Sequence, residues 1–117
     1  MSAAWESFHR AARELASAAP IKQRLTLAYS KHLKELTVDD LPSELHSVFA
    51  GLSSQLTCVS PLRGESAVCA TVRKMSNDEA ETVAQQIVQV LADLAAHRET
   101  PVQVKPRRVL SLYAAEG

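Results

Sequence analysis

The sequence contains few of the residues from which phosphate-binding loops and metal sites are built. There are 3 glycines and 2 cysteines in 117 residues. Gly51, Gly64 and Gly117 are too widely separated to form a glycine-rich loop, which would present successive backbone amides to an anion. The sequence therefore argues against a nucleotide-dependent enzyme.

The cysteine and histidine patterns of metal sites and nucleophilic enzymes are also missing. Cys58 and Cys69 fall in separate predicted elements, without the close spacing of a zinc or thioredoxin-like motif. We expect both cysteines to be reduced and to act as small apolar residues. The alternative is a reactive thiol, which would need electropositive neighbours such as Arg63 or Arg73 to lower its pKa. No H-x-x-x-H or H-E-x-x-H motif occurs among the four histidines, His9, His32, His46 and His97. We expect no metal, no cofactor and no catalytic residues.

The chain also lacks a net charge and a long apolar run. Its 13 basic and 13 acidic residues cancel, so no overall field attracts nucleic acid or an anionic membrane. The same neutrality removes charge repulsion between copies, so a homodimer is permitted. No run of about 18 apolar residues occurs, and the start has no basic segment followed by an apolar one. The sequence predicts a cytoplasmic protein without a membrane partner.

The residues that are present indicate an all-α protein. An apolar fraction of 46% is enough for one core in a chain of this length. The five prolines divide the chain into helix-sized pieces, and periodicity predicts helices over 2–18, 21–36, 42–56, 65–75 and 77–97. We expect a compact antiparallel helical bundle or orthogonal array of about five helices as one domain over residues 1–100. Residues 101–117 should form an extended or partly helical C-terminal tail.

Apolar residues at three- and four-residue steps predict which face of each helix is buried. The first stripe is Trp5, Phe8, Ala12, Leu15 and Ala16. The second is Ile21, Leu25, Ala28, Tyr29, His32, Leu33 and Leu36. The third is Leu41, Leu45, Val48, Phe49, Leu52 and Leu56, and the fourth is Val68, Val72 and Met75. The fifth is wider than one stripe needs: Val83, Ala84, Ile87, Val88, Val90, Leu91, Leu94 and Ala95.

Two short polar segments predict helix starts. In Ser76-Asn77-Asp78-Glu79, the Ser76 side chain can accept from the Glu79 amide while the Glu79 carboxylate accepts from the Ser76 amide. Thr37, followed by two acids and Pro42, is a second cap that ends one helix and precedes the next.

His32 belongs to a short segment that resembles a known family. His32-Leu33-Lys34-Glu35 resembles the phospho-accepting helix of histidine-phosphotransfer domains, which are small four-helix bundles. That helix typically reads His-x-Leu-Lys-Gly, whereas here the glycine is missing and Glu35 would repel a phosphoryl group. The resemblance implies a phospho-acceptor role for His32. The alternative is a partly buried histidine among Tyr29, Leu33 and Leu36, which its position in the apolar stripe favours.

Basic residues mark the candidate surfaces for a partner. Arg73-Lys74 ends the fourth predicted helix, where positive charge is also favoured by the helix dipole. Arg63 lies in a loop before that helix. The tail contains a basic run and an apolar end, from which we take Lys105, Arg107, Arg108 and Tyr113 as partner-binding candidates.

These observations predict a small cytoplasmic interaction or regulatory protein that is not an enzyme. It would bind a protein partner through a helical face or the tail, because the apolar surface of 83–95 and of the tail exceeds what a short chain readily buries. One alternative is a nucleic-acid-binding regulator that uses the basic tail with Arg73 and Lys74. The other is a histidine-phosphotransfer-like module that acts through His32.

Overall fold

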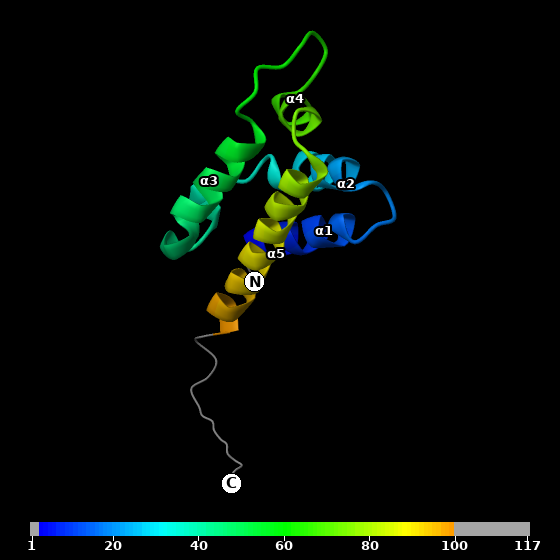
Figure 1. Ribbon diagram of the computed structural model, residues 1–117. Helices are drawn as coiled ribbons and strands as arrows, with labels where there is room; N and C mark the ends of the chain where they lie inside the picture. The colour runs from blue at the N-terminus through cyan, green and yellow to red at the C-terminus, as the bar shows by residue number, and fades with distance from the viewer. Residues whose placement is uncertain (1–2, 100–117) are drawn as a thin grey trace.

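Helices make up most of residues 3–99, the part of the chain that the computed structural model describes (Figure 1). This part contains five α-helices and no strand, which confirms the all-α prediction. None of these helices is long and apolar enough to cross a bilayer. The helices are α1 (Ala3–Leu15), α2 (Ile21–Ala28), α3 (His46–Leu56), α4 (Ala67–Arg73) and α5 (Asn77–Glu99).

The long helix α5 is the central element. Helices α1 and α2 pack against it, α3 lies along another flank, and α4 sits at one end where it contacts α2 and α3 (Figure 1). A heptad-like set of side chains on α5 is buried in the shared core: Ala80, Val83, Ala84, Ile87, Val90 and Leu94. Every α-helix contributes side chains to the same core cluster. The short helix α4 contributes only Val68 and Val72, whereas each of the other helices contributes at least one larger Leu, Ile or Phe side chain.

The first helix is shorter than predicted, and its buried face agrees with the predicted stripe at Phe8 and Leu15 but not throughout. It ends at Leu15, and its buried residues are Ala4, Phe8, Ala11 and Leu15. The predicted stripe is therefore wrong at Ala12, which is half-buried, and at Ala16, which is exposed. Alanine occurs on all sides of this helix, so Phe8 decides the packed face: its ring meets that of Phe49 edge to face, 6.0 Å between centroids.

The second predicted helix continues past Ala28, but not as an α-helix throughout. Residues Tyr29–Leu33 form a π turn, η1, in which the Lys34 amide donates to the Tyr29 carbonyl at 2.9 Å. A π turn holds one more residue than an α turn. The buried stripe of Leu25, Ala28, Tyr29 and Leu33 survives this change, while the helical span stops before Leu36.

Two short 3-10 turns, η2 (Val38–Asp40) and η3 (Ser43–Leu45), lead into α3, which starts at His46 rather than near Pro42. The Thr37 amide donates to Asp40 Oδ2 at 2.8 Å, so Thr37 does begin a helical turn. The predicted third stripe is buried with one exception, because the Val48 side chain is 48% exposed.

Capping residues fix the starts of α4 and α5. The predicted capping box is confirmed: the Ser76 amide donates to Glu79 Oε1 at 2.8 Å and the Glu79 amide donates to Ser76 Oγ at 3.0 Å. Helix α4 begins at Ala67 instead of residue 65, because Ser66 Oγ accepts from the Cys69 amide at 3.1 Å.

Adjacent residues on α5 allow a sharp test of the core. Ile87 is fully buried and Val88 is 47% exposed. We expect Ile87→Ala to lower the free energy of unfolding by about 2–5 kcal/mol, because it leaves a cavity among packed side chains. Val88→Ala should change it by only about 0.5 kcal/mol. Urea unfolding followed by circular dichroism measures both, and equal losses would contradict this assignment of the α5 faces.

Candidate functional site

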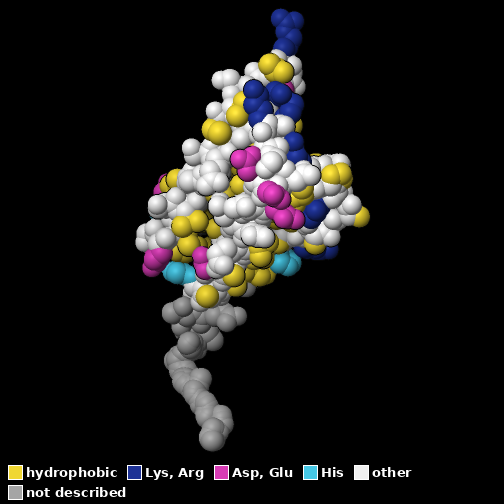
Figure 2. Space-filling model, in the orientation of Figure 1, with side chains coloured by type: hydrophobic (Ala, Val, Ile, Leu, Met, Phe, Trp, Pro, Cys, Tyr) yellow, Lys and Arg dark blue, Asp and Glu magenta, His cyan; other side chains and the backbone are white. Residues whose placement is uncertain are grey.

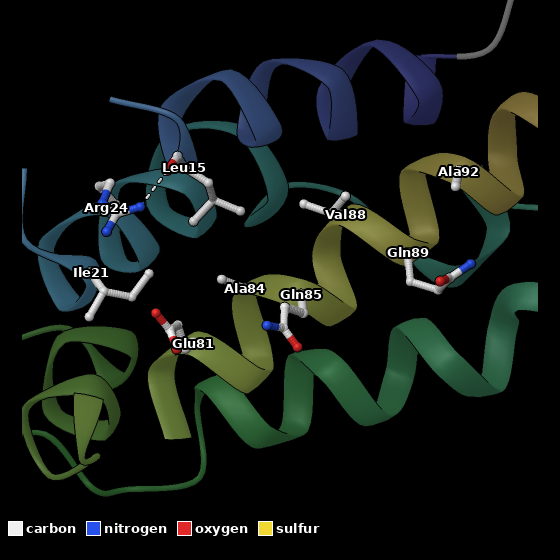
Figure 3. A pocket seen from close by; sticks show the side chains of 9 residues that line it. All are labelled: Leu15, Ile21, Arg24, Glu81, Ala84, Gln85, Val88, Gln89 and Ala92. Carbon is white, nitrogen blue, oxygen red and sulfur yellow. Dashed lines mark hydrogen bonds between the residues drawn. The ribbon is translucent and has the colours of Figure 1, made fainter. Parts of the chain in front are cut away.

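A groove of about 370 Å³ runs between α5 and the α1–α2 connection (Figure 3). Leu15 and Ile21 project from the α1–α2 side toward Ala84 and Val88 of α5. Val88 is 47% exposed and belongs to the apolar surface of 83–95 that the sequence indicates is wider than one packed stripe needs. The groove is lined by Leu15, Ile21, Arg24, Glu81, Ala84, Gln85, Val88, Gln89 and Ala92.

Two charged residues, Arg24 and Glu81, line the end of this groove near the start of α5. The Arg24 guanidinium donates from Nη1 to the Leu15 carbonyl at 2.7 Å and from Nε to the Ala19 carbonyl at 2.6 Å. Its charge is thereby held at the C-terminal end of α1. The exposed Glu81 carboxylate has no ion pair among residues 3–99. The groove therefore presents apolar side chains with one free carboxylate.

A second, polar pocket of about 300 Å³ lies beside the last turns of α1. It is lined by Arg10, Arg13, Glu14 and His32. His32 Nε2 lies 3.1 Å from Glu14 Oε1, and Lys31 Nζ lies 3.8 Å from the same oxygen. The side chains of His32 and Glu14 are 20% and 21% exposed.

The structure places His32 as a partly buried residue of the π turn η1. The neighbouring acid that matters is Glu14, which is 18 residues away in the sequence and which the sequence reasoning missed. A phosphoryl group on Nε2 would have to displace this carboxylate. The phospho-acceptor role of His32 stays a prediction.

The predicted partner-binding residues that lie within residues 3–99 are Arg63, Arg73 and Lys74, and they lie toward one end of the molecule. Figure 2 shows Lys and Arg side chains gathered at the end formed by α4 and the loop between α3 and α4. Arg63 and Lys74 are exposed there. Arg73 is paired instead: Nε donates to Glu65 Oε2 at 2.8 Å and Nη2 donates to Glu65 Oε1 at 3.1 Å.

The Glu65–Arg73 pair closes the turn that leads into α4. Gly64 has a φ of +77°, a conformation that glycine adopts without strain, and the Leu62 amide donates to Glu65 Oε1 at 3.0 Å. Lys22 Nζ donates to the Arg73 carbonyl at 3.0 Å and so satisfies the end of α4. These contacts give Glu65, Arg73 and Lys22 structural roles, so Arg73 offers less free charge to a partner than the sequence predicted.

Four of the predicted partner-binding residues lie outside the described residues. They are Lys105, Arg107, Arg108 and Tyr113, and the predicted domain boundary at residue 100 lies at the edge of the described part. The nucleic-acid hypothesis that depends on the tail stays a prediction.

The two cysteines are free thiols at different places on the surface. Cys58 is exposed and lies in a shallow pocket with Val59, Lys74 and Met75. Cys69 is half-buried between α2 and α4. Within residues 3–99, His, Cys, Asp and Glu side chains form no group of three that could hold a metal ion.

The comparisons with known proteins add no relative: no family model, no curated protein and no solved structure matches this chain. The assignment of a function therefore depends on the geometry of the two surfaces described above.

The Glu65–Arg73 pair predicts a pH-dependent contribution to stability. Hydrogen bonds from Arg73 and from the Leu62 amide lower the pKa of Glu65 below its ordinary value of 4.5. A carboxyl whose pKa is lower in the folded state stabilises the fold above its unfolded pKa, and this contribution is lost as the pH falls through the folded pKa. We expect Glu65→Gln to reduce the urea midpoint at pH 7 and to reduce it less as the pH falls below 4.5.

Glu35→Gln is the matched control, because Glu35 is exposed and its carboxylate makes no hydrogen bond or ion pair within residues 3–99. Its urea midpoint should follow the wild type at each pH. A deficit of the Glu65→Gln variant that is the same at pH 7 and at acid pH would contradict the role of the ionised carboxylate.

Proposed function

We propose that this chain is a non-enzymatic interaction module that binds an amphipathic helix of a protein partner in the groove between α1, α2 and α5. The observation that carries the proposal is the exposure of Val88 inside an apolar groove. Folding alone would favour covering this side chain, and a partner helix supplies the missing cover. This assigns the wide apolar surface of α5 partly to the core and partly to recognition.

The dimensions of the groove suit a helix. Its α5 wall extends from Glu81 to Ala92, which corresponds to about 16 Å of helix axis at about 1.5 Å per residue. That length accommodates about three turns of a partner helix. Helices bound in this way insert apolar side chains at positions i, i+3 or i+4, and i+7, and the small side chains of Ala84 and Ala92 leave room for them.

Charge complementarity specifies the partner further. Glu81 lies at one end of the groove, and the exposed Asp78 precedes it by one turn of α5. Arg24 on the opposite wall is already bonded to two carbonyls. A basic residue at the corresponding end of the partner helix would pair with Glu81, which orients the helix and selects against acidic segments. The proposed partner is therefore a basic amphipathic helix, and binding of a second copy of this chain is an outcome that the experiment below distinguishes.

Site-specific photo-crosslinking in the native cell tests this proposal. A photoreactive amino acid replaces the exposed Gln85 at the rim of the groove, and a control chain carries it at the exposed Ser47 on α3. We expect an adduct from position 85 but not from 47. Peptide mapping should locate it in a partner segment with apolar residues at helical spacing and adjacent Lys or Arg.

A blocking variant with a matched control completes the experiment. Ala92→Glu places bulk and negative charge in the groove, whereas Ala50→Glu makes the same change at an exposed position of α3. We expect the adduct to fall at least about tenfold for Ala92→Glu, as for one lost anchor residue, and to persist for Ala50→Glu. Three outcomes would overturn the proposal: equal adducts from both sites, an adduct with twice the mass of the chain, or a link to residues 101–117.

A further inference from the structure

The polar pocket beside α1 is independent of the groove and has a different chemistry. Four ionisable side chains line it: Arg10, Arg13, Glu14 and His32. Arg10, Arg13 and Glu14 are three and four residues apart on α1, so they share one face of that helix. The π turn η1 places His32 against this face, with Nε2 3.1 Å from Glu14 Oε1.

The two arginines are the unusual feature of this pocket. Neither guanidinium has a hydrogen bond or an ion pair within residues 3–99, although both line the same small volume. Arg10 and Arg13 are one turn apart on α1, so their like charges repel each other and favour a bound anion between them. Arginine presents its donors in a planar fork that matches the oxygens of an anion.

The charges around the pocket do not balance. Glu14 contacts both His32 and Lys31, with Lys31 Nζ at 3.8 Å, so its single negative charge is already shared. The Arg10 and Arg13 guanidiniums carry two positive charges in the pocket, while the charge of Glu14 is offset by Lys31, which lies outside the lining. A dianion would neutralise this excess, whereas a carboxylate monoanion would leave half of it.

We propose that this pocket binds a phosphate dianion, as inorganic phosphate or as the phosphoryl group of a small metabolite. The Arg10 and Arg13 guanidiniums donate to its oxygens, and Glu14 holds the His32 ring at the edge of the site. A phosphoryl group carries about −1.5 to −2 charges at neutral pH and three acceptor oxygens, which suits two forked donors. The pocket volume of about 300 Å³ exceeds that of the phosphate alone and leaves room for a small organic substituent.

Nuclear magnetic resonance titration of the full chain tests the site. Sodium phosphate and phenyl phosphate are added separately at constant ionic strength, while the Nε–H signals of Arg10 and Arg13 and the ring signals of His32 are followed. We expect saturable shifts of these signals with a Kd in the millimolar range or below. Tighter binding of phenyl phosphate would identify an organic phosphate as the ligand, and equal or weaker binding would identify inorganic phosphate.

Matched variants separate this site from general attraction by positive charge. We expect Arg10→Gln and Arg13→Gln each to raise the Kd about tenfold, as for one lost charge-assisted hydrogen bond. Lys34→Gln and Arg63→Gln remove the same charge from exposed positions outside the pocket and should leave the Kd within about twofold. All four positions are exposed, so the backbone amide spectrum should report an unchanged fold.

Two results would overturn the proposal. Equal weakening by the variants inside and outside the pocket would indicate attraction to the whole surface. The same shifts with sodium acetate at the same Kd would indicate an adventitious ion only. The groove variant Ala92→Glu should bind phosphate as the wild type does, because Ala92 does not line the polar pocket. The outcome is therefore independent of the partner-helix proposal.

Discussion

Burial of one face of α5 is the constraint on which the rest of the structure depends. Ile87 and Val90 at the middle of this helix are almost inaccessible to solvent, and α1, α2 and α3 all pack around the same cluster. Residues 3–99 form one hydrophobic core cluster, as expected for a chain of this size. Each surrounding helix must therefore turn its larger side chains toward α5. The surface of α5 that none of these helices covers becomes the α5 wall of the groove.

Polar contacts at the helix ends hold this packing in place. Three basic side chains donate to carbonyls or carboxylates at the ends of α1 and α4: Arg24 at the end of α1, Lys22 at the end of α4, and Arg73 on Glu65. The last carbonyls of a helix have no partner within it, so a donor from a neighbouring helix satisfies them and fixes the angle at which the two helices meet. Positive charge on α2 is thus used largely inside the fold.

The sequence predicted the features that are local and missed those that depend on distant residues. The Ser76–Glu79 capping box needs only four consecutive residues, and it appears where predicted. The predicted packed face of α1 was wrong at Ala12 because alanines on every side leave the spacing ambiguous. The packing of α1 against α5 and α2, with Phe8 against Phe49, decides which side is buried.

The same distinction applies to the candidate sites. Val88 fits the apolar spacing of α5, but whether it is covered depends on how far α1 and α2 extend. The contact between Glu14 and His32 joins residues 18 apart, and no local pattern indicates the π turn that brings them together. His32 was singled out from the sequence, whereas Arg10, Arg13 and Glu14 around it were not, because their shared pocket exists only in the folded chain.

The last turn of α1 connects the two proposed surfaces. Glu14 and Leu15 are adjacent residues, about 100° apart around the helix, so one faces the polar pocket and the other faces the groove. Arg24 bonds the carbonyl of Leu15, and His32 and Lys31 hold the carboxylate of Glu14. Both sets of contacts come from the helical segment that begins with α2. The position of this segment against α1 therefore sets the geometry of both surfaces.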